Sequence, residues 1–183
     1  MKPVNKQALV DSLESHVERQ LSEVIKLFQN ETEPFLNRPA PDGGWSIAQC
    51  LEHLNSYGHY YLPLIGQGLQ DSPKTDAAES FTSTWLGSYM NQIMDPKTGR
   101  KKHQAFKAHI PALSLEAHQV VAEFIDQQEK LLTFLRLSRQ ADLNAIRLPI
   151  SISRWVKLRL GDVLQFLIAH QERHLLQAKR HLP

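Results

Sequence analysis

The chain has 183 residues, of which 42% are hydrophobic and 22% charged, and its formal net charge is only +2. These are ordinary proportions for a soluble globular protein, so we predict a single domain over residues 1–183 with a substantial core. The near-neutral charge, without a basic stripe interleaved with aromatic residues, argues against a nucleic-acid partner. The single cysteine, Cys50, excludes an intrachain disulfide.

The first residues lack the apolar stretch of a secretory signal. No apolar run approaches the ~18 residues that are needed to cross a membrane. We therefore expect a cytoplasmic protein with no membrane partner.

Two helices are predicted in the first third of the chain. Apolar residues recur at spacings of three and four from about residue 6 to residue 30, which is typical of an amphipathic helix. Prolines and glycines between residues 34 and 44 then break this pattern. The second helix begins at Ser46, which with Gln49 three residues later has the pattern of a capping box. We expect Pro63 to kink or end this helix.

Residues 66–113 are predicted to form a long crossover, because glycines and prolines recur along them with one short helical candidate at 84–93. A segment of this kind often shapes a binding site. Its basic residues are interpreted as part of a solvated loop, with an anion site as the alternative. These residues are Lys97, Arg100, Lys101 and Lys102.

Two more long helices are predicted in the last third of the chain. The third starts near Ser114, a candidate N-cap, and ends near residue 139. Residues 148–155, with the sequence LPISISRW, could form a short extended piece, although Pro149 disfavours a central strand. The fourth helix covers about residues 160 to 181. Four long amphipathic helices with one long crossover predict an all-α fold, an antiparallel four-helix bundle with its crossover between helices 2 and 3.

Two histidines, His170 and His174, lie where the apolar stripe of the fourth helix predicts core. Residues four apart share one helix face, with Cβ atoms roughly 5–6 Å apart, so two imidazoles can bind one metal ion. The competing interpretation is a pair of core histidines, whose ring nitrogens would then need partners inside the core. Two histidines cannot fill a tetrahedral shell. His53, at the edge of the buried stripe of the second helix, is the best candidate for a third ligand.

The remaining histidines are interpreted as surface or incidental residues: His16, His59, His103, His109, His118 and His181. Cys50 lies one turn before His53 and is interpreted as a small buried apolar residue, with a thiolate ligand or nucleophile as the alternative. Gln177 follows His174 by three residues. It could orient a ligand histidine from behind or cap polar surface, and both interpretations stay open.

Two blocks of the sequence resemble the DinB/YfiT-like superfamily. GWSIAQCLEHLNSY, residues 44–57, is similar to that family's second-helix motif, a Trp-Ser start with a histidine seven residues after the serine. LGDVLQFLIAHQERHLLQAKR, residues 160–180, is similar to its last-helix motif, a Leu-Gly start followed by H-x-x-x-H and a glutamine. The family is a four-helix bundle that binds a divalent metal through these histidines. The resemblance implies that His53, His170 and His174 are metal ligands.

Three protein ligands leave at least one coordination position open, the pattern of catalytic rather than structural zinc sites. A bound ion would activate water or a thiol and polarise a substrate oxygen. The resembled family includes metal-dependent hydrolases and thiol-dependent transferases or isomerases. The resemblance therefore implies a metal-dependent enzyme acting on a small molecule by hydrolysis or thiol transfer, with zinc, nickel or manganese and a low-molecular-weight thiol as cofactor candidates.

The sequence names no general base. Gln171 takes the place of the glutamate that follows the first histidine in H-E-x-x-H proteases. Glu172 is about 200° around the helix from His170, so we expect it to point away from the metal. The alternative function is a non-catalytic stress-related binding module with a structural metal, closed for example by Cys50, or with none. A homodimer is also considered, because bundles of this size often pair through an exposed helix face.

Overall fold

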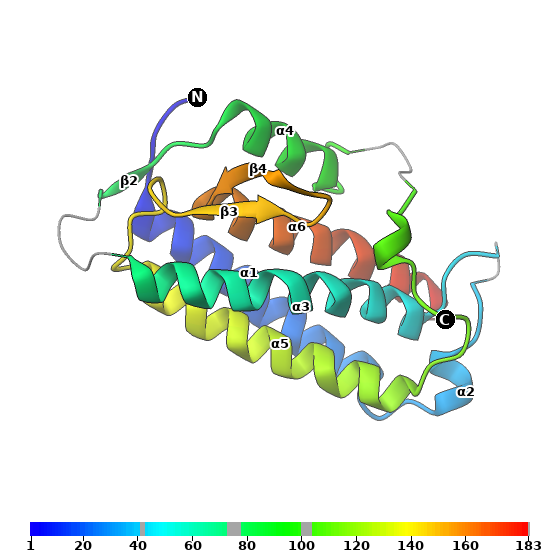
Figure 1. The fold of residues 1–183 in the computed structure, drawn as a ribbon. Coiled ribbons are helices and arrows are strands. Elements are labelled where there is room, and N and C mark those ends of the chain that lie inside the picture. The colour runs from blue at the N-terminus through cyan, green and yellow to red at the C-terminus, as the bar shows by residue number, and fades with distance from the viewer. Residues whose placement is uncertain (41–42, 73–77, 100–103, 183) are drawn as a thin grey trace.

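Helices make up most of the computed structural model, which describes residues 1–40, 43–72, 78–99 and 104–182. The α-helices are α1 (Lys6–Phe28), α2 (Glu33–Leu36), α3 (Ile47–Asp71), α4 (Trp85–Met94), α5 (Ala117–Ser138) and α6 (Leu160–Ala178) (Figure 1). Two 3-10 turns are η1 (Lys107–His109) and η2 (Lys179–His181). The strands are β1 (Val4–Asn5), β2 (Ser80–Phe81), β3 (Arg147–Ile150) and β4 (Ser153–Arg159). The chain is mostly helical, as predicted, with two small strand pairs added.

The four long helices lie side by side (Figure 1). α3 packs against α5 and α6, and α1 packs against the same two helices, while α4 packs against α6. The buried side chains between them form two apolar clusters, one around Tyr61 and Phe81 and the other around Phe28 and Phe124. No helix in the described part of the chain is long and apolar enough to cross a membrane.

The predicted capping box of α3 is present. The Ser46 hydroxyl accepts a hydrogen bond from the Gln49 backbone N–H at 3.1 Å, and the Gln49 side chain accepts one from the Ser46 N–H at 3.0 Å. Each side chain thus satisfies a backbone group that the helix start leaves free. This cap defines the start of α3, and His53 lies two turns further along on the buried face of that helix.

The helix α3 continues through Pro63 to Asp71, so the expectation that it ends at this proline is wrong. Pro63 and His59 are both exposed, and the carbonyl that loses its helical partner can therefore be hydrated. The other face of the helix stays buried through Tyr61 and Ile65. The crossover consequently begins after residue 71 rather than at residue 66, and its predicted short helix is α4.

The third long helix begins at Ala117, three residues after the predicted N-cap Ser114. Its first N–H groups are capped from another part of the chain, because the Glu33 carboxylate accepts hydrogen bonds from Ala117 N at 2.9 Å and His118 N at 2.8 Å. A distant carboxylate thus takes the place of the local cap that the sequence suggested.

Residues 147–159 form an antiparallel β3–β4 hairpin rather than the single short extended piece. Pro149 lies within β3 opposite Lys157. A two-stranded sheet has only edge strands, which tolerate a proline that cannot donate to a ladder. A second antiparallel pair joins β1 to β2, so that the start of the crossover is held beside the N-terminus.

The crossover is fastened to α6 by Asp162, whose side chain is fully buried. Its carboxylate accepts hydrogen bonds from the Thr84 N–H at 3.1 Å and the Thr84 hydroxyl at 2.8 Å, and it also contacts the Ser83 hydroxyl. Thr84 is in turn the N-cap of α4. A Cβ added at Gly87 would lie 2.0 Å from Cγ of Asp162, so only glycine permits this close approach of α4 to α6.

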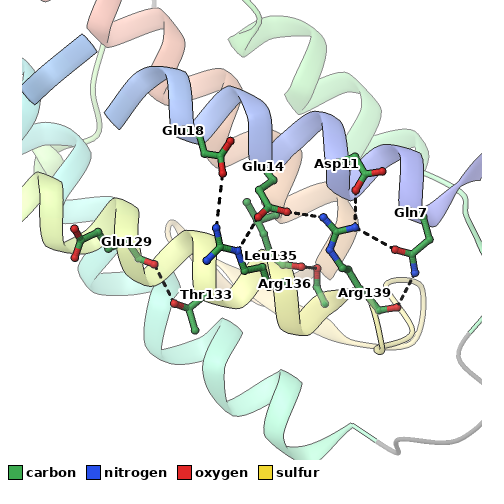
Figure 2. Close-up of polar contacts among 10 residues, drawn as sticks. Gln7, Asp11, Glu14, Glu18, Glu129, Thr133, Leu135, Arg136 and Arg139 are labelled. Carbon is green, nitrogen blue, oxygen red and sulfur yellow. Dashed lines mark hydrogen bonds and ion pairs between the residues drawn. The ribbon is translucent and has the colours of Figure 1, made fainter. Parts of the chain in front are cut away.

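A network of ion pairs joins α1 to α5 (Figure 2). Arg139 contacts Glu14 and Asp11, each at 2.5 Å, and Arg136 contacts Glu14 at 2.7 Å and Glu18 at 3.7 Å. Glu14 is half-buried and accepts from both arginines, so it is the centre of the network. Hydrogen bonds from Arg136 and Arg139 lower the pKa of this carboxyl below its ordinary value of 4.5.

We predict that Glu14→Gln lowers the free energy of unfolding at pH 7 by about 1 kcal/mol, a value kept small by solvent screening. A lowered folded-state pKa contributes stability above pH 4.5 that is lost as the pH falls through the folded pKa. The difference between wild type and variant should therefore shrink as the pH falls toward 3. Urea denaturation at pH 7 and pH 3 measures it, and the exposed Glu18→Gln variant is the control. A difference that persists at pH 3 would contradict this account.

Candidate metal centre

The three histidines that the sequence singled out meet between α3 and α6. His53 comes from α3 and the other two, His170 and His174, from α6, and one nitrogen of each lies within 4.8 Å of the others. Nε2 of His53 is 3.2 Å from Nε2 of His170. The ring of His174 has its centroid 4.6 Å from that of His53 and 4.7 Å from that of His170. The three nitrogens are therefore close enough together to bind a single metal ion.

Burial keeps these three rings neutral near pH 7. His53 and His170 are buried, and His174 is half-buried. Desolvation lowers the pKa of His53 to about 4 and that of His174 to about 3. The pKa of His170 lies well below its ordinary value, first because of burial and then because of the neighbouring histidines. Each ring therefore retains a lone pair that a metal ion can bind.

Hydrogen bonds on the outer nitrogens direct two of these lone pairs inward. Nδ1–H of His53 donates to the backbone carbonyl of His109 at 2.6 Å, and Nδ1–H of His174 donates to Oε1 of Gln177 at 3.2 Å. A ring that donates through Nδ1 has a bare Nε2. Partners of this kind commonly orient metal-ligating histidines. The contact supports the interpretation of Gln177 as an orienting residue.

The donor set fits a divalent metal such as zinc or nickel. It consists of three neutral imidazole nitrogens, which these ions prefer. Metal–nitrogen bonds of about 2.0–2.1 Å in a tetrahedral shell place the ligand nitrogens roughly 3.3 Å apart. The observed 3.2 Å between the Nε2 atoms of His53 and His170 matches this spacing. Two inward lone pairs at that distance repel each other unless a cation or a proton lies between them.

Aromatic rings cover the three histidines. The Trp45 ring lies 4.9 Å from that of His53 and 5.9 Å from that of His174, and Tyr57 lies 4.6 Å from His170. The Trp45 backbone carbonyl is 3.0 Å from Nε2 of His181 in η2. The 3-10 turn η2 thus helps to hold Trp45 over the histidines. His174 is the most exposed of the three histidines, so the centre is least covered on its side.

The interpretation of His109 and His181 as surface residues is wrong, because both are buried. The His109 ring stacks on Tyr57 with centroids 4.0 Å apart, and its Nδ1 is 2.9 Å from the Ser56 hydroxyl. Its carbonyl is the partner of His53. No periodic pattern marks η1, so only the tertiary contacts reveal this residue. His16, His59 and His118 are exposed as predicted, whereas His103 and part of the predicted basic loop fall outside the described residues.

Two further residues that the sequence weighed lie apart from the three histidines. Cys50 is fully buried in the apolar cluster around Phe28, and burial raises the pKa of its thiol to about 12, as for a small core residue. Glu172 pairs with Arg19 at 2.8 Å and with Gln20 at 3.1 Å. These partners belong to α1, so Glu172 points away from the centre, as predicted.

We predict that the metal-free protein loses stability as the pH falls from 7.5 to 5. The unfolded chain binds protons on its histidines below about pH 6.5, whereas the folded chain, with depressed pKa values, does not, so stability falls with pH. His53 alone should account for roughly 2 kcal/mol of this loss. Urea denaturation of wild type and His53→Leu at several pH values measures it. Equal slopes for the two proteins would contradict the buried neutral state of His53.

Comparison with known proteins agrees with this geometry. The chain matches the DinB superfamily over residues 16–178, a range that includes all three histidines and both helices that carry them. No curated protein and no solved structure matches the chain. The length of the family match and the three-histidine cluster lead to one conclusion: the chain belongs to the DinB superfamily.

Proposed function

We propose that this chain is a divalent-metal-dependent enzyme built on an antiparallel four-helix bundle, with His53, His170 and His174 as the ligands of zinc, nickel or manganese. The observation that carries the proposal is the convergence of three neutral imidazoles, two buried and one half-buried, with no fourth ligand among the residues that the structure describes. Within the described residues, neither Cys50 nor a carboxylate joins that group. A structural site would be closed by a fourth protein ligand, whereas three ligands leave room for a reactant.

A divalent ion held by three neutral ligands lowers the pKa of a coordinated water or thiol and polarises a substrate oxygen. Neighbouring residues of the chain orient and shield the three histidines that would bind this ion. The His109 carbonyl and Gln177 hold protons on the outer nitrogens of His53 and His174. Trp45 and Tyr57 shield the rings from water. A small-molecule substrate approaches from the side of His174, where the centre is least covered.

The lack of a carboxylate in the three-histidine group favours thiol transfer over hydrolysis. A thiol has an ordinary pKa near 8.5, so a metal ion alone suffices to deprotonate it at neutral pH. Glu172 is held by Arg19 and Gln20 on the far side of α6, where it cannot act as a general base. We therefore propose transfer of a low-molecular-weight thiol to a small electrophile as the principal reaction, with hydrolysis as the second.

We predict about one divalent metal per chain in protein purified without a metal-binding tag. His170→Ala should lower the affinity for zinc by more than ~100-fold, because it removes a direct ligand. Elemental analysis and competition with a chelator measure both quantities. Glu172→Gln is the control on the same helix, and it should keep the metal content and any thiol-transfer or hydrolase activity of the wild type.

Wild-type protein that takes up no zinc, nickel or manganese on reconstitution would contradict the metal site. Stoichiometric metal without turnover in screens of thiol transfer and hydrolysis would contradict the enzyme, and would favour a binding module.

A further inference from the structure

The β3–β4 hairpin presents positively charged side chains to the outside of the molecule. In the register of this ribbon Leu148 lies opposite Leu158, and both side chains are buried, so this pair marks its inner face. Successive residues of a strand alternate between the two faces of a sheet. Their neighbours Arg147 and Lys157 therefore belong to the outer face, and both side chains are exposed.

A bulge in β4 places an aromatic ring beside these cations. Between the pair at Lys157 and the pair at Ser153, the intervening residues of β4 have no partner on β3. Trp155 lies in this bulge with 81% of its surface exposed, and the guanidinium of Arg154 lies 4.9 Å from the centre of its ring. Ile152, in the turn before the bulge, is exposed as well. Bulges commonly re-aim a side chain for a purpose other than strand pairing.

The cations of the hairpin lack the anionic partners that the arginines between α1 and α5 have. Residues 143–161 contain four cations and no acidic residue. None of these cations forms an ion pair with a carboxylate among the described residues. Arg147 even lies directly opposite Arg159, and like charges at opposite positions destabilise a ribbon. An anion outside the chain would remove this repulsion.

The turn of the hairpin is attached to α3. The Tyr60 hydroxyl donates a hydrogen bond to the Ile150 carbonyl at 3.2 Å, and the Tyr61 hydroxyl accepts one from the Ser151 N–H at 3.1 Å. The inner face of the ribbon packs into the apolar cluster around Tyr61 and Phe81. The outer face is therefore held in a fixed orientation, and its binding to a partner requires little further ordering of the backbone.

The neighbouring helix α4 adds apolar side chains without adding charge. It packs against β4 and contains no charged residue. Trp85 and Tyr89 on this helix are both exposed, and their rings stack on each other with centroids 5.9 Å apart. Exposed tryptophan and tyrosine rings together with unpaired cations are typical of a surface that contacts the headgroup region of a lipid layer.

We propose that the outer face of the β3–β4 hairpin docks on a membrane surface of anionic phospholipids. Arg147, Arg154 and Lys157 bind the lipid phosphates, and Trp155 and Ile152 enter the headgroup region. This contact is peripheral and needs no membrane-spanning helix. It departs from the expectation of no membrane partner, which depended on the lack of such a helix in the sequence. The inference is independent of the metal centre.

Two other partners fit this face less well. Arg154 covers one side of the Trp155 ring, so fewer ring faces are free for the stacking of nucleic-acid bases. Ile152 offers a base no ring at all. Two copies of the chain that met through this face would bring their unpaired cations together, because a two-fold contact places the same patch on both sides.

Co-flotation of the full-length protein with vesicles tests the proposal. We expect binding at low ionic strength to vesicles of equal parts phosphatidylcholine and phosphatidylglycerol. Binding should weaken in high salt, which screens the charges, and should be much weaker to vesicles of phosphatidylcholine alone. The same protein is also tested with a single-stranded oligonucleotide in place of the vesicles.

A double variant, Arg147→Gln with Lys157→Gln, should bind the anionic vesicles about 25-fold more weakly, because each cation near such a surface contributes roughly 5-fold. The matched control is Lys26→Gln with Lys130→Gln, which removes the same charge from exposed positions on α1 and α5 and should keep the affinity of the wild type. Trp155→Ala keeps the charge and should also weaken binding, since it removes the ring that enters the headgroup region.

The proposal is overturned if wild-type protein does not float with the anionic vesicles at low ionic strength. It is also overturned if the control variant loses as much affinity as the hairpin variant, because the attraction would then come from net charge alone. Binding to the oligonucleotide without binding to vesicles would overturn it in favour of a nucleic-acid surface. Urea denaturation and metal content, which should match the wild type in every variant, separate these results from effects on folding or on the metal centre.

Discussion

Three histidines can be buried against one another only while all three are neutral, and the surrounding structure serves this requirement. Charged imidazoles at such distances would repel and would lack hydration, which is why their pKa values fall so far. Neutral rings still need partners for their outer nitrogens. The fold supplies a backbone carbonyl to His53 and a side-chain amide to His174. The centre consequently depends on three separate segments of the chain, which are α3, η1 and α6.

The crossover is therefore a structural part of the centre. At one end, Asp162 of α6 binds Thr84 and holds α4 against α6. At the other end, η1 places His109 on Tyr57 and its carbonyl on His53. Ion pairs also join α1 to α5 through Glu14 and Arg139 and to the end of α6 through Glu23 and Lys179.

The sequence correctly predicted those features of the structure that depend on interactions between residues close together in the chain. The spacing of His170 and His174, the capping box at Ser46 and the apolar stripes of the long helices all depend on neighbours within a few residues. His53 was the best candidate for the third ligand because of its place at the edge of the buried stripe of the second helix, and the resemblance to a known family implied the same residue. The errors arose where a distant group intervened. Glu33 caps α5 in place of Ser114, and the packed face of α3 carries the helix past Pro63. His109 was missed because its role depends on a carbonyl in a segment without periodicity.

The central claim is that three imidazole nitrogens, and no sulfur or carboxylate of the chain, bind one divalent ion. X-ray absorption at the zinc edge of the reconstituted full-length protein tests it most directly. The account predicts a first shell of three imidazole nitrogens at about 2.0–2.1 Å with one or two further light atoms from solvent or buffer. A shell that contains sulfur at about 2.3 Å, or one with fewer than three imidazoles, would contradict it.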